Sequence, residues 1–226
     1  MNYSNVCPAR FVRRPNRFVA EVETEEGPLT VHVKNTGRCR ELLVPGARVW
    51  LTRSDNPLRK TAYDLIAVEK GARLINMDAN APNAAFGEFA AAGRFLPGME
   101  HLRREVTYGA SRFDFAFTVD GVPHYAEVKG VTLEDSGRVY FPDAPTLRGV
   151  KHLHELMGAK QAGLGAHLIF VIQMENVTAF SPNDSTHPAF GEALRQAVQA
   201  GVDVRAYCCA VTPDSMVIDA PVPLRL

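Results

Sequence analysis

Short stretches of alternating apolar and polar residues, separated by glycine and proline, fill the first third of the chain. Over Leu29–Lys34, for example, Val31 and Val33 alternate with His32. The pattern predicts further strands over 9–24 (broken or bulged at Pro15), 47–53, 62–70 and 74–77, and a helical turn or short helix over 35–43. Many short strands in so little chain favour a small antiparallel barrel.

After residue 80 the spacing of apolar positions changes to that of a mixed α/β domain. Helices are expected over 82–93, 146–162 and 188–200, with Thr146 as the N-cap of the second. Strands are expected at 103–107, 113–119, 125–131, 167–173 and 204–211, and the dense apolar run His167–Gln173 is typical of the buried centre of a sheet. We therefore expect an α/β (mixed α+β) chain, with a small barrel domain over residues 1–80 and a mixed-sheet domain with flanking helices over 81–226.

Three polar residues interrupt two of these apolar strands. The strands that carry Asp114 and Glu127 are joined by Asp120-Gly121, a pair that favours a tight hairpin turn. Because side chains alternate across a strand, Glu127 and Lys129 share a face, and the hairpin brings Asp114 near Glu127. Two carboxylates and an ammonium are costly to hold together on apolar strands unless something pairs with them.

A hard divalent cation is the natural partner for two carboxylates. We expect Asp114, Glu127 and the backbone carbonyl of Val128 to bind Mg²⁺ or Mn²⁺, and Asp114, Glu127 and Lys129 to be the catalytic residues. Lys129 would orient an attacking water or stabilise negative charge on a phosphate in the transition state. The alternative is a buried lysine–carboxylate pair without a catalytic role.

Composition narrows the class of protein. Hydrophobic residues make up 46% and charged residues 22% of the chain, which is ordinary for a globular domain. The first residues carry no apolar signal region and no apolar run is long enough to span a membrane, so we expect a cytoplasmic protein with no membrane partner. The spacing of the four cysteines fits neither a disulfide framework nor a zinc site, and His152 and His154, two residues apart, face different directions on a helix.

The order of strand with Asp, strand with Glu-x-Lys, helix and strand resembles the PD-(D/E)XK nuclease core. Asp114 matches the metal-binding Asp of that family, Glu127-Val128-Lys129 matches its (D/E)-x-K element, and Phe113 stands where its name puts Pro. An E-x-K match alone is weak, because it arises by chance on many exposed strands. Here the flanking residues are apolar, which argues against an ordinary surface strand.

The same resemblance suggests where further site residues lie. Candidates for an additional acid are Glu88 on the preceding helix, Glu105 on the first strand of the domain and Asp143 in a proline-bounded loop. A solvated helix carboxylate and a turn residue are the alternatives for Glu88 and Asp143. Arg148 and Lys151, at the start of the next helix, are expected to contact phosphate, with ordinary helix-surface charge as the alternative.

A closer resemblance covers nearly the whole chain. Five blocks, in order, are similar to the sugar fermentation stimulation protein A family: Phe11-Val-Arg-Arg-Pro-Asn-Arg-Phe, Asn35-Thr-Gly-Arg-Cys-Arg-Glu-Leu-Leu-Val-Pro-Gly, Ser111-Arg-Phe-Asp-Phe, Glu127-Val-Lys-Gly-Val-Thr-Leu and Phe141-Pro-Asp-Ala-Pro-Thr-x-Arg-Gly-x-Lys-His-Leu. This resemblance implies an N-terminal OB-like domain, a PD-(D/E)XK-like domain after it, and non-specific DNA binding with a link to sugar metabolism. Cys39 departs from the apolar residue expected there, which we expect to be harmless.

Positive charge is concentrated in the N-terminal part of a chain whose formal net charge is zero. Arginines near the first strand are expected to contact phosphate, while Phe11 and Phe18 are expected in the core. The nucleic-acid-binding candidates there are Arg10, Arg13, Arg14 and Arg17. Asn35, Thr36 and Arg38 belong to a compact turn that either binds phosphate through backbone N–H groups or simply turns the chain.

Three functions compete on these residues. The first is a metal-dependent nuclease acting on DNA, with RNA as the alternative substrate; the second is a DNA-binding regulator of sugar metabolism genes whose nuclease-like domain no longer cuts. The presence of Asp114, Glu127 and Lys129 together favours the first, because only catalysis needs all three. A protein-interaction module is the third, and salt-dependent DNA affinity would exclude it. The sequence leaves the oligomeric state open, a dimer included.

Overall fold

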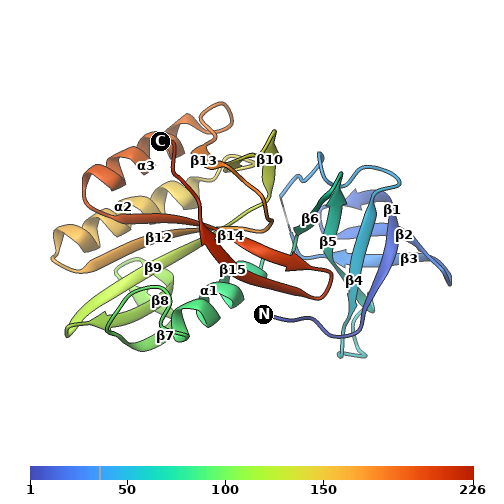
Figure 1. Cartoon of the computed structure of the whole chain (residues 1–226), viewed down its shortest axis with the longest axis horizontal. Coiled ribbons are helices and arrows are strands. Elements are labelled where there is room, and N and C mark those ends of the chain that lie inside the picture. The colour runs from blue at the N-terminus through green and yellow to red at the C-terminus, as the bar shows by residue number, and fades with distance from the viewer. Residues whose placement is uncertain (36) are drawn as a thin grey trace.

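The strands of the first domain close into a small barrel in the computed structural model, which describes residues 1–35 and 37–226 (Figure 1). These strands are β1 (Val6–Asn16), β2 (Val19–Thr24), β3 (Gly27–Val33), β4 (Arg48–Arg53), β5 (Tyr63–Lys70) and β6 (Arg73–Asn76). Their order is β3-β2-β1-β4-β5-β6, and an added pairing between β3 and β5 closes β1–β5 into a five-stranded barrel. The predicted OB-like barrel is confirmed.

The strand predicted over residues 9–24, broken or bulged at Pro15, is two strands, because the chain reverses after Asn16. β1 and β2 are antiparallel partners, and the side-chain oxygen of Asn16 accepts the backbone N–H of Phe18 at 2.8 Å. An Asn side chain that bonds two residues ahead stabilises such a turn. The expectation that both phenylalanines lie in the core holds for Phe11, which is 3% exposed, and is wrong for Phe18, which is 47% exposed at the turn.

The second domain is built on a mixed sheet of six strands in the order β15-β14-β12-β9-β8-β7 (Figure 1). The strands are β7 (Met99–Tyr108), β8 (Ser111–Val119), β9 (Val122–Val131), β12 (Gly165–Ile172), β14 (Asp203–Thr212) and β15 (Ser215–Pro221). β12 pairs in parallel with β9 and β14, and all eight of its residues are buried. The strand predicted as the buried centre is therefore confirmed.

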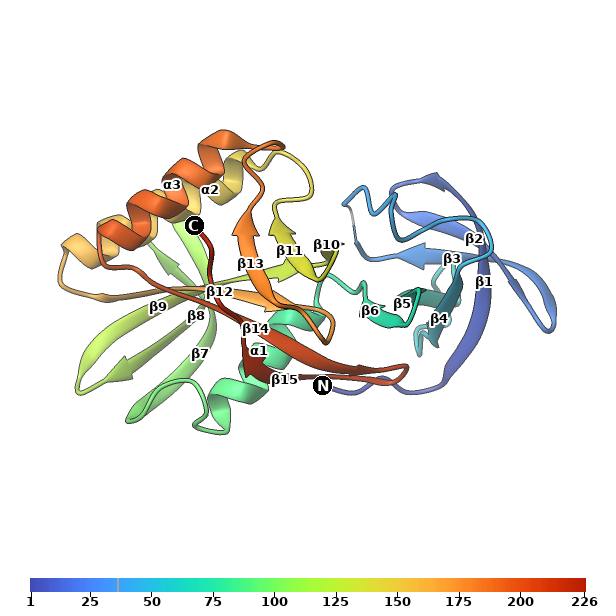
Figure 2. The ribbon, with the colours of Figure 1, turned by 45° about the horizontal axis from the view of Figure 1, so that its top comes forward.

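Three helices cover the two faces of this sheet (Figure 2). They are α1 (Ala81–Ala91), α2 (Leu147–Gln161) and α3 (Pro188–Gln199). α2 and α3 lie side by side on one face, where Leu153 and Phe190 join the core, and α1 covers the other face with Phe86. The predicted N-cap is also confirmed, since Thr146 Oγ1 accepts the N–H of Gly149 at 3.0 Å. The mixed α+β architecture is as predicted.

The loop predicted after β9 contains two short strands that the sequence pattern did not reveal. β10 (Leu133–Asp135) and β11 (Arg138–Phe141) form a small sheet with β13 (Ala179–Pro182). The pairing between β11 and β13 joins residues about 40 positions apart, and so short a strand depends on such distant partners more than on its own pattern. β15 was missed as well.

Buried polar contacts fix the barrel against the second domain. Glu134, at the small sheet, receives Lys70 and Arg73 from the barrel. The side-chain amide of Gln173, just after β12, donates to the backbone of Asn76 and Asp78 at 3.0 and 3.1 Å. The two domains are therefore joined by specific pairs. Within the described residues, no helix has the length and apolarity needed to cross a bilayer.

Candidate functional site

The hairpin of β8 and β9 brings the three predicted catalytic residues together. Asp120 and Gly121 form its turn, both with positive φ, and Val119 pairs with Val122 across it. The pairing of β8 with β9 reaches Phe115 and Ala126 and stops there. Beyond that point the Oδ2 of Asp114 accepts the backbone N–H of Val128 at 2.8 Å, so the carboxylate stands where a strand partner would be.

Glu127 is the centre of the cluster and is 3% exposed. Its Oε1 accepts the Nζ of Lys129 at 2.5 Å and also the Nδ1 of His152 from α2. Its Oε2 is buried, with no hydrogen-bond partner in the described part of the chain. A buried carboxylate oxygen without a donor is costly, which makes this atom the most distinctive feature of the site.

The two carboxylates of the cluster are shifted in opposite directions. Burial, followed by the negative charge of Glu127, raises the pKa of Asp114 above its ordinary value, although Val128 N–H and Asn83 oppose the shift. Burial also acts to raise the pKa of Glu127, but the hydrogen bond from His152 and the charge of Lys129 outweigh it and hold that pKa low. A cation between the two would relieve the repulsion that Asp114 feels.

Besides Asn83, whose Nδ2 donates to Asp114 Oδ1 at 2.9 Å, the site residue that sequence reasoning missed is His152. The spacing of His152 and His154 predicts that they face different directions, and they do: His152 is 4% exposed and His154 is exposed. The Nε of Arg148 donates to His152 Nε2 at 3.3 Å. The available signal was a histidine inside the apolar stripe of a helix, next to Leu153.

The remaining acidic candidates lie apart from this cluster or at its edge. Glu88 is exposed and pairs with the amino group of Met1 at 2.6 Å, and Glu105 is exposed and pairs with Arg112 at 3.6 Å. Asp143 is half-buried and, with Asn35 of the barrel, lines a cavity of about 120 Å³ between the two domains. Of the three, Asp143 is the one that the fold places at the carboxyl end of β9.

The two basic candidates on α2 differ in what their side chains contact. Lys151 is exposed, donates to the backbone carbonyl of Ala110 at 3.1 Å and pairs with Glu155 at 3.6 Å. Arg148 is exposed at the first turn of the helix and contacts His152 with its Nε. Arg148 therefore lies next to the carboxylate cluster at the exposed start of the helix.

The arginines of the barrel also differ in the partners of their guanidinium groups. Arg14 is tied to the backbone, since its two terminal nitrogens donate to the carbonyls of Arg17, Asn35, Gly37 and Arg38 at 2.6 to 3.1 Å. Arg13 forms a two-armed ion pair with Glu21, and Arg10 donates to the carbonyl of Gly46.

Arg17, Arg38 and Arg40 are exposed around a hollow of about 340 Å³ that Arg14 also lines. Arg17 additionally lies over the ring of the exposed Phe18. Four arginines therefore line this hollow, and three of them are candidates predicted from the sequence. Thr36, predicted to belong to the same turn, lies outside the described residues.

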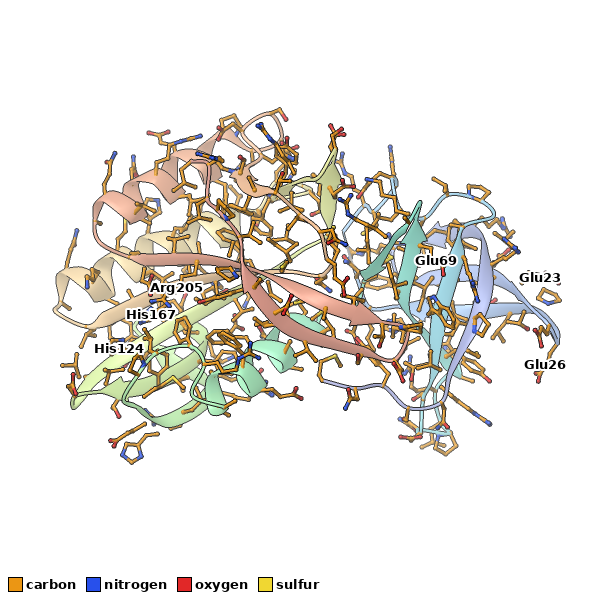
Figure 3. The ribbon with its side chains drawn as sticks, in the orientation of Figure 1. Glu23, Glu26, Glu69, His124, His167 and Arg205 are labelled. Carbon is orange, nitrogen blue, oxygen red and sulfur yellow. The ribbon has the colours of Figure 1, made fainter. Side chains whose placement is uncertain are left out.

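A second polar cluster lies at the opposite end of β9 and β12 (Figure 3). His124 Nδ1 is 2.8 Å from His167 Nε2, His167 Nδ1 is 2.9 Å from Asp203, and Arg205 pairs with the same carboxylate. Every member has a partner in the cluster, so we regard it as structural.

The donor set of the main site suits a hard cation that brings other ligands with it. Across residues 1–35 and 37–226, no three His, Cys, Asp or Glu side chains converge as a ready-made metal cage. Mg²⁺ is usually held by one or two carboxylates, with water and substrate phosphate completing its shell. Asp114 and the free oxygen of Glu127 meet that requirement.

Comparison with known proteins gives consistent matches over both domains. The SfsA N-terminal OB domain model matches residues 12–77, and the sugar fermentation stimulation protein RE domain model matches residues 80–215. A sugar fermentation stimulation protein homolog of Desulfitobacterium hafniense is 51% identical over 96% of this chain and 94% of its own, and one of Ruminiclostridium cellulolyticum is 46% identical over all of both chains. The structure of Pyrococcus furiosus SfsA in complex with Ca²⁺ has a TM-score of 0.91 at 27% identity and covers 100% of this chain and 98% of its own.

Proposed function

This chain belongs to the sugar fermentation stimulation protein family, and from that membership we propose that it is a non-specific nucleic-acid-binding protein with a divalent-metal-dependent phosphodiester-cleaving site. Asp114, Glu127 and Lys129 would form that site, and the barrel would hold the nucleic acid. DNA is the expected substrate, with RNA as the alternative.

One observation carries the proposal: the Oε2 of Glu127 is buried without a donor beside a second carboxylate. A structural carboxylate at this depth would have both oxygens paired, because each unpaired buried oxygen costs about 1–3 kcal/mol. The cluster therefore keeps one strong acceptor unused, as a metal ligand must be before its ion binds.

The residues present fit Mg²⁺ or Mn²⁺. Asp114, Glu127 and the backbone carbonyl of Val128 would hold the ion, and their all-oxygen set is what hard cations prefer. The archaeal relative in complex with Ca²⁺, another hard cation, supports this choice. A bound ion supplies Lewis-acid activation of a phosphate oxygen and of water.

The side chains of this chain account for the rest of the chemistry. Hydrolysis adds one water across a P–O bond: the water oxygen bonds to phosphorus and the leaving oxygen takes a proton. Lys129, whose Nζ is 2.5 Å from Glu127, would hold the attacking water or stabilise the charge that develops on the phosphate. Arg148, exposed at the start of α2, would contact the neighbouring backbone phosphates.

The barrel would bind the phosphate backbone of the nucleic acid. Arg17 and Arg38 are exposed around one hollow, with Arg40, and such a surface binds phosphates with little regard for sequence. Arg10 is exposed on β1 and adds to the charge, whereas the charge of Arg13 is paired with Glu21. Affinity should therefore fall steeply as salt rises.

The test is cleavage of single- and double-stranded DNA and RNA with Mg²⁺, with Mn²⁺ or with EDTA. We expect the wild type to cut only with metal, and Glu127→Gln and Asp114→Asn to lose cutting while they still bind nucleic acid. Glu192→Gln, which changes an exposed carboxylate on α3, is the matched control and should cut like the wild type. Metal-independent cutting, or cutting retained in both site variants, would refute the site.

A catalytically inactive DNA-binding regulator is the second candidate function. The ion pair of Glu127 with Lys129 favours it, because the cluster already carries a compensating positive charge without any metal. The same experiment separates the two functions. Binding without cutting, unchanged in Glu127→Gln and Asp114→Asn, is the result expected of the regulator.

A further inference from the structure

His152 is buried against the candidate site yet comes from a different element, α2. Its side chain is 5% exposed, and its ring packs edge-on against Phe113, the neighbour of Asp114, at 6.4 Å between ring centres. The adjacent positions of the helix stripe, Leu153 and Leu156, are core hydrophobics. An apolar residue would fill this position without any buried polar group, so a histidine here has to be explained by what its nitrogens contact.

Three polar neighbours of the ring determine which nitrogen carries the proton. Arg148 can only donate, so the Nε2 that faces its Nε is the acceptor. Nδ1 then carries the hydrogen and donates it to Oε1 of Glu127, a much shorter contact than the 3.4 Å from Nδ1 to Lys129 Nζ. Lys129 donates to the same oxygen, so Oε1 receives two donors while Oε2 receives none.

We propose that His152 is a positioning residue that orients the Glu127 carboxylate for its cation. Resting on the proposed function, this assigns His152 the task of locking Oε1 so that Oε2 is the oxygen left to bind metal. Lys129 alone cannot fix the carboxylate, because its flexible chain and rotatable ammonium follow the oxygen wherever it turns. A planar ring held by Phe113 and Arg148 offers its N–H in a single direction.

The role predicts a particular pattern among variants. His152→Leu keeps the volume and removes the donor, whereas the amide nitrogen of His152→Asn can take the place of Nδ1 and donate to Glu127. Loss of a hydrogen bond to a ligating group typically lowers metal affinity by about 10–100-fold. We therefore expect Mn²⁺ affinity to fall by about that factor in His152→Leu and to be largely restored in His152→Asn.

The measurement is a titration of the whole protein with Mn²⁺ in the absence of nucleic acid, with free Mn²⁺ followed by electron paramagnetic resonance. His154→Leu changes the exposed histidine two residues along the same helix and should bind like the wild type. Urea unfolding without metal reports whether each variant is folded, and His152→Ala replaces His152→Leu if the latter is not. In cleavage assays the Mn²⁺ concentration for half-maximal rate should rise more than the rate at saturating Mn²⁺ falls.

Three results would overturn the proposal in distinguishable ways. Wild-type affinity in His152→Leu would show that the ring does not position the carboxylate. Equal loss in the Leu and Asn variants would show that His152 supports the fold and not the donor geometry. Failure of the wild type to bind Mn²⁺ at all would refute the proposed metal site and the role of His152 with it.

Discussion

Two buried glutamates, Glu127 and Glu134, lie seven residues apart in the chain and differ in how their oxygens are paired. Glu134 is 5% exposed and has both oxygens paired: Oε2 accepts Lys70 Nζ at 2.7 Å, and Oε1 accepts Arg73 and the N–H of Gly137. Glu127 is equally buried, but its two donors converge on one oxygen and leave the other bare. Burial alone therefore does not separate a structural carboxylate from a functional one.

The difference lies in what surrounds each group. The charged partners of Glu134 come from the barrel, so its ion pairs join two domains. Glu127 faces a second carboxylate, Asp114, which its charge pushes toward a higher pKa. A carboxylate with spare acceptor capacity next to a like charge is poised for a ligand, whereas one with complete pairing is poised only to hold the structure.

The contrast between Glu134 and Glu127 should have its largest effect on the free energy of unfolding. Glu134→Gln leaves Lys70 and Arg73 without a charge partner, and since those side chains stay 32% and 26% exposed, we expect a loss of about 3 kcal/mol and not the upper end for a buried pair. Glu127→Gln also takes the charge partner from Lys129, which is 16% exposed, but it relieves the repulsion of Asp114 and keeps an amide oxygen that can accept a hydrogen bond, so we expect a smaller loss of about 1–2 kcal/mol. Urea unfolding at pH 7 without divalent cations measures both.

The same two variants should respond oppositely to metal. Mn²⁺ at about 100 times its dissociation constant should stabilise the wild type and Glu134→Gln by about 2.7 kcal/mol and leave Glu127→Gln unchanged. A stability loss in Glu127→Gln as large as that in Glu134→Gln, without any response to Mn²⁺ in the wild type, would erase the distinction between the two glutamates.

The sequence predicted the cluster around Glu127 but not the pairing of Glu134. Alternation along β9 and the Asp120-Gly121 turn are local signals, and they sufficed to place Glu127, Lys129 and Asp114 together. Glu134 depends on Lys70, 64 residues away, and no local pattern specifies such a contact. The same reason explains the missed strands β10 and β11.

His152 and Arg14 were misjudged for a related reason. The partner of His152 is 25 residues away on a strand that α2 packs against, so the pairing exists only once the helix is docked. Residue type groups Arg14 with its neighbours, although its guanidinium donates to backbone carbonyls that include those of Asn35 and Gly37. Residue type gives the charge of a side chain, but the fold decides whether that charge is still free.

Arginines of the barrel provide a second, smaller test of the contrast. Arg14 donates to four backbone carbonyls, so Arg14→Ala should destabilise the protein by about 2 kcal/mol. Arg38 is exposed at the rim of the same hollow, so Arg38→Ala should leave stability within about 0.5 kcal/mol of the wild type.

Of the two variants, Arg38→Ala should change stability least, but it should weaken nucleic-acid binding. Fluorescence anisotropy across a salt series should show that Arg38→Ala weakens binding and lowers the slope of log affinity against log salt by about 1. An unchanged slope would remove Arg38 from the phosphate contacts, and a large loss of stability in Arg38→Ala would make it a structural residue like Arg14.

The smallest expected effect is the pH dependence of stability, and its sign is the most informative. Burial, with the charge of Glu127, raises the pKa of Asp114 in the folded protein, so the unfolded chain releases that proton at a lower pH than the folded protein does. The ionised carboxylate therefore costs stability at pH 7, and the cost vanishes below the unfolded pKa of about 3.9, where both states are protonated. Asp114→Asn should be more stable than the wild type at pH 7, with an advantage that shrinks as the pH falls.

Glu134 should show the opposite trend in the same urea series from pH 7 to pH 3. Burial acts to raise its pKa, but Lys70 and the N–H of Gly137 outweigh it and hold that pKa low. Its contribution is therefore complete above the unfolded pKa of about 4.3 and is lost as the pH falls through the folded pKa, so the deficit of Glu134→Gln should narrow in acid. Asp219→Asn, at an exposed position, should follow the wild type throughout. If Asp114→Asn were instead less stable at pH 7, the hydrogen bonds from Asn83 and the N–H of Val128 would outweigh the repulsion by Glu127, and the cluster would have no unmet charge for a cation to neutralise.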